Sequence, residues 1–295
     1  MKPVIALLAV ASALSIAACS AQPDGIIRKS GTSKDGGAGS DNSADPTGTP
    51  GGTTPTPGTT TPTSDGGTDS GPAGAISSHG SGGPTGQTEL TSTGGLSYIV
   101  NAPATTNKPW GLLVLLHGST ASNYRELITI MQTVATAENL IRVSVLAPNG
   151  QGWNEGDQNA AADLLDKALK QDVLTKYDVD LSRIVFSGQS SGGGFLSSYF
   201  LPLHAKDYRG GAFMQCGAAP PVPAFTPDAA TKAGFHLHFE ITTGDPIWPD
   251  SYKAAVAAYT SLGMNLTKDD TKPGGHCAFD QGAVVQAHIA TILPP

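Results

Sequence analysis

The chain has 295 residues, of which only 14% are charged, and it contains 37 glycines and 22 prolines. Such a composition is typical of a folded part joined to a segment that cannot fold. With 17 basic against 24 acidic residues the net charge is −7, which argues against a protein that binds nucleic acid through its charge. Three cysteines are too few for a disulfide-built scaffold or a cysteine-rich zinc module.

The beginning of the chain predicts export. Lys2 precedes the uncharged, apolar residues 4–18, a stretch too short for a transmembrane helix but typical of a secretory signal. It ends in Ile16-Ala17-Ala18-Cys19, which resembles the lipobox of bacterial lipoproteins. The resemblance implies a signal peptide over residues 1–18 and a lipid on Cys19 that holds the chain at the membrane of the cell envelope. Ser20 at the next position implies the outer membrane, with its periplasmic or surface face left open. An ordinary signal peptide that contains a cysteine is the alternative.

Residues 19–86 are predicted to form a disordered tether. Between residues 31 and 86, 43 of 56 positions are Gly, Ser, Thr or Pro. So little apolar surface cannot offset the entropy of ordering the chain. Lys34 is the only basic residue in that stretch, so no nucleic-acid partner is expected here. The folded part is therefore placed at residues 87–295.

Apolar runs alternate with helical patterns along the folded part. The expected strands are residues 110–116, 141–146, 183–186, 211–215 and 236–242. The expected helices are residues 122–140, 163–177, 191–203, 251–263 and 281–292. This alternation predicts an α/β fold with a mostly parallel central sheet flanked by helices, in which ligands bind at the carboxyl ends of the strands. Little sequence remains for a lid.

A nucleophile motif follows the third expected strand. Gly188-x-Ser190-x-Gly192 matches a sharp strand-to-helix turn that lifts a serine hydroxyl clear of the sheet. The residues two positions away must be small so that strand and helix can approach each other. The helix behind the turn directs N–H groups and the positive end of its dipole toward a developing oxyanion. Ser190 is the predicted nucleophile, and a glycine-rich structural turn is the alternative.

A catalytic serine needs a base, and in this type of fold the acid and then the histidine follow the serine along the chain. Asp245 stands just past the expected strand 236–242, where it would fix the histidine tautomer. Asp250 is the other candidate, although its position is more typical of the start of the next helix. His276 lies on a glycine-rich loop before the last helix and is the predicted base. A solvated loop histidine is the alternative.

The remaining histidines are predicted to be structural. His79 lies in the tether, His204 ends a helix and His288 lies within the last helix. His236 and His238 are two apart on one strand and could bind a metal ion, but no third ligand follows at a suitable spacing. We therefore expect no metal ion and no cofactor.

The turn after the first expected strand carries a resemblance to a known fold family. Leu116-His117-Gly118-Ser119-Thr120 resembles the His-Gly turn that forms the oxyanion hole in α/β-hydrolases. The resemblance implies that the backbone N–H groups of Ser119 and Ser191 bind the oxyanion. It leaves His117 as a structural hydrogen-bonding residue.

Two further runs make the resemblance more specific. Residues 146–154, Leu-Ala-Pro-Asn-Gly-Gln-Gly-Trp-Asn, and residues 177–184, Tyr-Asp-Val-Asp-Leu-Ser-Arg-Ile, precede the serine motif. Together they resemble the serine esterases that include polyhydroxybutyrate depolymerases and feruloyl or acetyl-xylan esterases. The resemblance covers residues 97–292 and implies an α/β-hydrolase with the order Ser190, Asp245, His276. The Cys277-Ala278 that follows His276 departs from the Thr-Trp-Pro common in the family, so the natural ester is not carried over.

Four residues are candidates for the wall of the substrate site, because they fall on loops at the same edge of the sheet. They are Trp153, Asn154, Gln189 and Trp248. A tryptophan can equally cover the core, which is the alternative for both indoles.

The cysteines outside the lipobox are predicted to pair. If Cys19 carries lipid, Cys216 and Cys277 remain for a disulfide in an oxidising compartment. Cys216 follows the expected strand 211–215 and Cys277 adjoins His276, and these ends lie near each other in the expected strand order. The bond would hold the histidine loop. Two buried free cysteines are the alternative.

Taken together, the motifs predict a secreted, lipid-anchored serine esterase that forms an acyl-enzyme on Ser190. The resemblance suggests esters of polyhydroxyalkanoate, feruloyl or acetyl-polysaccharide type. A serine peptidase of the same fold and a non-catalytic surface-binding lipoprotein are the alternatives. The sequence leaves the oligomeric state open.

Overall fold

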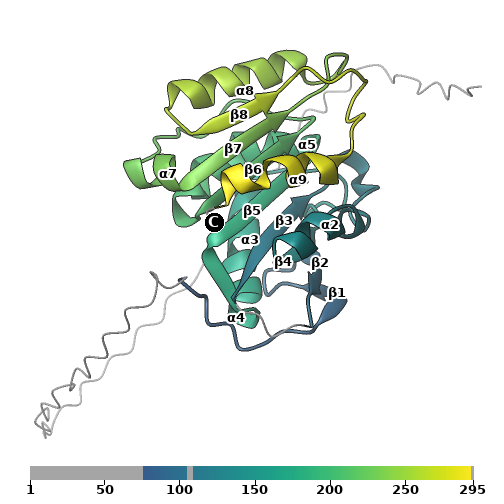
Figure 1. Ribbon diagram of the computed structural model, residues 1–295, viewed down its shortest axis with the longest axis vertical. Coiled ribbons are helices and arrows are strands. Elements are labelled where there is room, and N and C mark those ends of the chain that lie inside the picture. Colours follow the sequence, from purple (N-terminus) through teal and green to yellow (C-terminus); the bar gives the residue numbers. More distant parts are fainter. Residues whose placement is uncertain (1–75, 105–108, 294–295) are drawn as a thin grey trace, which may run out of the picture. The chain divides into compact units, whose positions relative to one another are not determined.

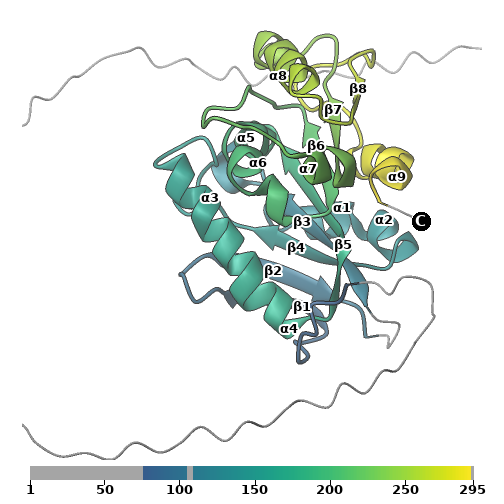
Figure 2. The same ribbon diagram turned by 90° about the vertical axis from the view of Figure 1, so that its left-hand side faces the viewer.

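The computed structural model describes residues 76–104 and 109–293; the predicted signal peptide, Cys19 and the tether up to residue 75 lie outside them. The described residues form an eight-stranded sheet with helices on both faces (Figures 1 and 2). Within these residues, no helix combines the length and apolarity needed to span a membrane.

The sheet is mostly parallel, as the sequence predicts. Its strands are β1 (Gly86–Thr91), β2 (Ser97–Ala102), β3 (Trp110–Leu116), β4 (Leu140–Val145), β5 (Val179–Gln189), β6 (Gly210–Gln215), β7 (Phe235–Glu240) and β8 (Leu266–Asp269). They lie in the order β1-β2-β4-β3-β5-β6-β7-β8. β1 and β2 pair antiparallel at one edge, and β2 pairs antiparallel with β4, whereas the strands from β4 to β8 are parallel.

Two apolar clusters, one on each face of the sheet, make up the core. The helices are α1 (Leu127–Ile130), α2 (Gln132–Ala137), α3 (Gln158–Lys167), α4 (Leu174–Lys176), α5 (Ser191–Phe195), α6 (Leu201–His204), α7 (Ala229–Gly234), α8 (Pro249–Ser261) and α9 (Gln281–Ile292). Residues of α3, α5 and α8 pack in one cluster, and residues of α1, α2 and α9 pack in the other. β3 is buried along its whole length because both clusters cover it.

The structure differs from the predicted elements near the beginning of the folded part. The helix expected at 122–140 is two short helices, because Met131 departs from helical geometry between them and Asn139 takes a positive φ of 53°. Its apolar spacing still places Leu127, Met131 and Val134 against the sheet. The antiparallel strands β1 and β2 were not predicted, since exposed or half-exposed residues make up β1. The helix expected at 281–292 coincides with α9.

The chain joins the folded part earlier than the predicted boundary at residue 87. Residues 76–85, called the strap below, run along the segment from 175 to 181. Ser78 N–H donates to Val179 O at 2.8 Å and Gly82 N–H donates to Lys176 O at 2.7 Å. The hydroxyl of Tyr177 donates to Pro84 O at 3.0 Å. This part of the predicted tether is therefore ordered by backbone pairing, which composition alone does not reveal.

Candidate active site

Ser190 occupies the turn between β5 and α5. Its backbone has φ 49° and ψ −116°, a conformation that costs a non-glycine residue on the order of 1–3 kcal/mol. Ser190 N–H donates to Gln215 O at 2.8 Å, and Ser190 O accepts from Gly194 N–H at 2.9 Å. These bonds hold the turn, so the hydroxyl stands at the carboxyl end of the sheet.

Two glycines allow this turn to form. A Cβ at Gly188 would lie 2.5 Å from the carbonyl carbon of Gly192, and a Cβ at Gly192 would lie 2.5 Å from Leu116 O. Real Cβ atoms do not come so close to backbone. The small residues of the predicted motif are therefore required by the contact of α5 with β3 and β5.

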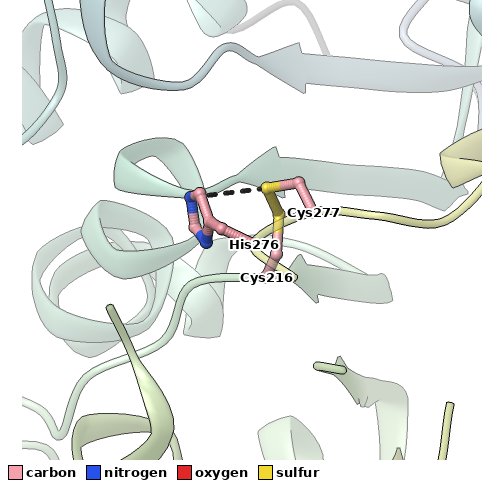
Figure 3. A group of neighbouring side chains, drawn as sticks. All are labelled: Cys216, His276 and Cys277. Carbon is pink, nitrogen blue, oxygen red and sulfur yellow. Dashed lines mark hydrogen bonds between the residues drawn. A yellow bond between two sulfur atoms is a disulfide. The ribbon is translucent and has the colours of Figure 1, made fainter. Parts of the chain in front are cut away.

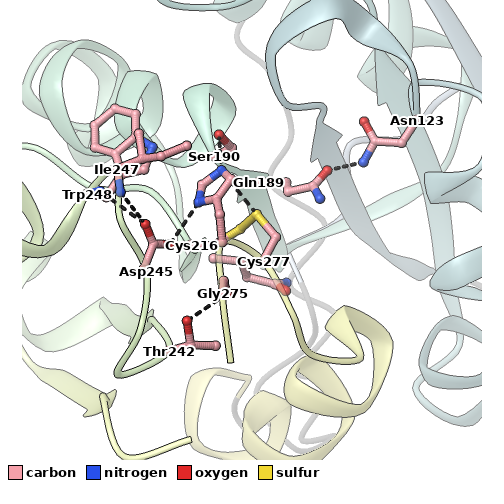
Figure 4. The surroundings of a disulfide bond; sticks show 12 residues. Asn123, Gln189, Ser190, Cys216, Thr242, Asp245, Ile247, Trp248, Gly275 and Cys277 are labelled. Atoms are coloured by element: carbon pink, nitrogen blue, oxygen red, sulfur yellow. Dashed lines mark hydrogen bonds and ion pairs between the residues drawn. A yellow bond between two sulfur atoms is a disulfide. The ribbon is translucent and has the colours of Figure 1, made fainter. Parts of the chain in front are cut away.

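The structure brings Ser190, His276 and Asp245 together. His276 Nε2 lies 2.9 Å from Ser190 Oγ, and His276 Nδ1 lies 2.7 Å from Asp245 Oδ2 (Figure 4). With the proton on Nδ1 donated to the carboxylate, Nε2 is free to accept the proton of the serine hydroxyl. His276 is about a quarter exposed, so its ring can reach a bound substrate.

Asp245, and not Asp250, contacts the histidine. The Asp245 side chain is fully buried, and its Oδ1 accepts the N–H groups of Ile247 at 2.8 Å and Trp248 at 3.1 Å. These bonds fix the carboxylate, whose other oxygen faces the histidine. Asp250 lies in the first turn of α8, is 99% exposed and pairs with Lys253.

A disulfide anchors the histidine loop. Cys216 and Cys277 are bonded, with their Cα atoms 5.1 Å apart, as the sequence predicts. Cys277 Sγ lies 3.5 Å from His276 Nε2 (Figure 3). On the other side of the loop, the hydroxyl of Thr242 donates to Gly275 O at 2.8 Å. The loop is thus attached to β6 covalently and to the end of β7 by a hydrogen bond.

The two residues predicted for the oxyanion hole meet beside Gly152. A Cβ at Gly152 would lie 3.4 Å from Ser119 Cα and 3.6 Å from Ser191 Oγ. Ser191 is the first residue of α5, where backbone N–H groups have no partner within the helix. Thr120 and Ala121, with φ of 68° and 52°, turn the chain sharply after Ser119. Ser119 and Ser191 therefore both lie next to Gly152, and their role as N–H donors to one carbonyl oxygen stays a prediction.

An open pocket of about 410 Å³ surrounds the serine. Its lining consists of Gly118, Ser119, Ser122, Asn123, Asn154, Gln189, Ser190, Ile247, Trp248, His276 and Cys277. Three of the four predicted wall residues, Asn154, Gln189 and Trp248, are among them. Amides and hydroxyls line one part of the wall, and Ile247 with Trp248 lines another.

Trp153, the fourth predicted wall residue, lies in the core instead. It is 1% exposed and stacks on Phe195 with ring centroids 4.8 Å apart. It also lies 5.9 Å from the ring of His117. The loop after β4 places Trp153 in the core and not in the wall of the pocket, because the apolar side chain of Phe195 on α5 packs against it.

His117 is structural, as the resemblance implies. It is fully buried, its Nδ1 lies 2.6 Å from Gly118 O, and its Nε2 accepts from Ala147 N–H at 2.9 Å. Burial lowers the pKa of His117, against the smaller effect of the bond to Gly118. A neutral ring therefore links the turn after β3 to the loop after β4.

Sequence reasoning missed Asn123 and Ile247. Asn123 Nδ2 donates to Gln189 Oε1 across the pocket (Figure 4), although its sequence position suggests only a helix cap. Ile247 is 62% exposed beside the triad, and its place two residues after Asp245 was the one available signal.

Comparisons with known proteins give matches of fold. Neither protein-family models nor the curated proteins give a match to the sequence. Among solved structures, a carboxylesterase from Mesorhizobium loti matches with a TM-score of 0.55 at 19% identity, over 69% of this chain and 98% of that one. A carboxylesterase from Bacillus cereus matches with a TM-score of 0.52 at 20% identity, over 65% and 93%. A ferulic acid esterase matches with a TM-score of 0.53 at 15% identity, over 70% and 96%.

The chain has the α/β-hydrolase fold. The sheet order, the turn at Ser190 and the position of His276 after the last strand all agree with it. In an α/β-hydrolase the chemistry is decided by the site and not by the fold. Here a serine hydroxyl, a histidine and a buried carboxylate lie in hydrogen-bond contact beside two candidate N–H donors, an arrangement that is able to perform acyl transfer.

Proposed function

We propose that this α/β-hydrolase is a serine esterase that hydrolyses carboxylic esters. The proposal rests on one observation, a chain of two contacts that joins Ser190 to the buried Asp245 through His276. Ser190 Oγ lies 2.9 Å from His276 Nε2, and His276 Nδ1 lies 2.7 Å from Asp245 Oδ2. Burying a carboxylate costs folding free energy, and a protein that only binds a ligand does not need a buried carboxylate beside a histidine. It is the arrangement that keeps a histidine in the tautomer of a general base.

The proposed reaction proceeds in two halves. Ser190 Oγ attacks the ester carbonyl as His276 Nε2 takes its proton, and the N–H groups of Ser119 and Ser191 stabilise the oxyanion. The imidazolium then protonates the leaving alcohol, which departs and leaves an acyl group on Ser190. Water, deprotonated by His276, attacks this acyl-enzyme, releases the carboxylic acid and regenerates the serine.

The lining of the pocket supports esters that combine an apolar and a polar part. Ile247 and Trp248 offer an apolar surface, while Asn123, Asn154 and Gln189 offer hydrogen-bond donors and acceptors. Acylated polysaccharides and polyhydroxyalkanoates have such a composition, and the open pocket accepts a segment of a longer chain. We therefore propose feruloyl, acetyl-polysaccharide or polyhydroxyalkanoate esters as the substrate class.

Hydrolysis of p-nitrophenyl esters of increasing acyl length tests the activity. The wild type is expected to hydrolyse short esters with a burst of p-nitrophenol, and Ser190→Ala is expected to lose the burst and almost all turnover. Ser261→Ala, which removes an exposed hydroxyl on α8, is the control and should retain the wild-type rate. Cleavage of peptide anilides with no cleavage of esters would point to a peptidase, and inertness of folded wild type to both would overturn the proposal.

We further propose that the enzyme is lipid-anchored in the cell envelope through Cys19, at the outer membrane. The Ile16-Ala17-Ala18-Cys19 run supports this, and residues 19–75 would form the spacer between membrane and enzyme. Expression in bacteria with an alkyne-labelled fatty acid tests it. The wild type should carry the label and sediment with membranes, and Cys19→Ala should do neither; a labelled Cys19→Ala protein would refute the assignment.

A further inference from the structure

Three side chains with metal-binding atoms gather where α9 crosses β7. His238 and Glu240 are two residues apart on β7, so both project to the face of the sheet that α9 covers (Figure 1). Both side chains are 0% exposed. His288, from α9, is half-buried and stacks on His238 with ring centroids 4.0 Å apart. One ligand atom of each residue lies within 4.8 Å of the other two.

A ring nitrogen of His238 faces a carboxylate oxygen of Glu240, and the tautomer of His238 decides what lies between the two atoms. His238 Nε2 lies 3.2 Å from Glu240 Oε2, and His238 Nδ1 lies 2.9 Å from Thr267 Oγ1. When Nδ1 carries the proton and donates it to Thr267, Nε2 directs a lone pair at the carboxylate. Two such acceptors stay together only with a proton or a cation between them.

We propose that His238, Glu240 and His288 bind a divalent transition-metal ion of the Zn²⁺ type, with water as the fourth ligand. Two imidazoles and one carboxylate are a donor set that suits Zn²⁺. Bonds of about 2.0–2.1 Å around a tetrahedral ion place neighbouring donor atoms about 3.3 Å apart. The separation of 3.2 Å between His238 and Glu240 fits that value. Among the described residues, none forms a hydrogen bond with a ring nitrogen of His288, whose ligand atom lies within 4.8 Å of those of His238 and Glu240.

The surroundings support the ligands. Thr267 would fix the orientation of the His238 ring, and Lys272 Nζ, 2.6 Å from Glu240 Oε1, binds the carboxylate oxygen that does not contact His238. Lys272 Nζ also lies 3.3 Å from Asp269 Oδ2, so this one ammonium group contacts two carboxylates. The third ligand, His288, comes from α9, about 50 residues further along the chain. The spacing of His236 and His238 in the sequence therefore did not indicate it.

Cobalt titration of the full-length chain, without a polyhistidine tag and after treatment with a chelator, tests the proposal. We expect one Co²⁺ per chain with the visible absorption of four-coordinate cobalt, its displacement by Zn²⁺, and a rise in Tm with either ion. His288→Ala should weaken binding at least about tenfold and abolish the rise in Tm. Circular dichroism checks that the variant is folded.

Two further variants locate the site. His204→Ala is the matched control, because His204 belongs to a separate cluster with Asp166 and Asp207, and it should bind Co²⁺ like the wild type. His288→Cys should restore binding and add the near-ultraviolet absorption of a cobalt–thiolate bond. Absence of Co²⁺ binding by the wild type, equal affinity of His288→Ala and wild type, or loss of binding in His204→Ala alone would each overturn the proposal.

Discussion

Ser190 and Asp245 take their roles from how their backbones are held. Ser190 keeps a positive φ because its N–H and C=O groups are both bonded, to Gln215 and Gly194. Asp245 keeps one oxygen bonded to two loop N–H groups and the other to His276. In both cases hydrogen bonds of the loop hold the residue in place before substrate binds. Such preorganisation is what a site for acyl transfer needs.

The two aspartates of this loop give the sharpest test at the residue scale. Asp245→Asn should lower kcat for a p-nitrophenyl ester by about 10⁴-fold, because the amide favours the wrong histidine tautomer. Asp250→Asn removes the same charge five positions away at an exposed site and should leave kcat unchanged. Equal kinetics of the two variants would contradict the assignment of Asp245.

The buried His117 predicts a pH dependence of stability. Burial lowers the pKa of His117 from its usual value of 6.5. Below pH 6.5 the unfolded chain therefore binds a proton at this residue, whereas the folded chain does not. Stability should therefore fall as the pH drops below 6.5, until the pH reaches the lowered pKa of the folded state. Urea unfolding from about pH 7.5 down to about pH 5.5 measures this. His117→Gln should show a shallower decline, and parallel curves for the two proteins would contradict the prediction.

Trp153 and Trp248 show what a sequence can and cannot tell about single residues. Both follow predicted strands at the same edge of the sheet, yet Trp153 packs on Phe195 and Trp248 lines the pocket. The difference depends on which apolar surface lies nearby, and that surface comes from distant parts of the chain. Ser190, Asp245 and His276 could be predicted because local glycines, strand ends and chain order define their positions.

At the scale of elements, buried strands were easier to predict than short helices. The run 110–116 is apolar throughout, which is typical of a strand buried on both faces, and it forms β3. The helix expected at 163–177 is α3 and α4 joined by the π-helical turn Ala168–Val173, and its start lies at Gln158, after the capping side chain of Asp157. Apolar spacing thus locates a helix and its buried face, while its ends depend on caps and neighbours.

The disulfide ties the end of β6 to the loop that carries His276. It connects the residue after β6 to the histidine loop across 61 positions of sequence. Replacing both cysteines by serine should lower the free energy of unfolding by about 2–4 kcal/mol. It should also lower kcat, since His276 would lose its covalent support. Urea unfolding and ester hydrolysis measure the two effects, and a variant with wild-type stability and kcat would show that the hydrogen bonds of the loop suffice.

At the scale of the molecule, the sheet explains why residues far apart in sequence form one site. The turns after β3 and β5 and the loops after β4, β7 and β8 all open at the carboxyl edge, and each supplies at least one pocket residue. The parallel order of the strands could be predicted from the alternation of strands and helices. The antiparallel β1 and β2 could not, since neither carries the continuous apolar run of a central strand.

The strap is paired with the rest of the folded part, although its composition predicts a disordered tether. Its glycines fit against Tyr177, and a Cβ at Gly83 would lie 2.4 Å from the Tyr177 ring. A chain that begins at residue 87 exposes this ring and leaves the backbone groups of Lys176 and Val179 without the partners they have in the strap. Because a net hydrogen bond contributes about 0.5–1.5 kcal/mol, we expect the chain from 87 to be about 1–3 kcal/mol less stable than the chain from 76.

Urea unfolding of the two chains measures how much the strap contributes to the free energy of unfolding. Point variants in the longer chain distinguish the effect of the strap's contacts from the effect of a shorter chain. Gly83→Ala places a methyl group against Tyr177 and should reproduce part of the loss. Ser81→Ala removes only a long 3.4 Å hydroxyl contact to Thr175 O and should behave like the wild type. The active-site edge does not include the strap, so kcat should be the same for both chains wherever they are folded. Equal stability of the two chains would mean that the bonds of the strap only balance the entropy of ordering it.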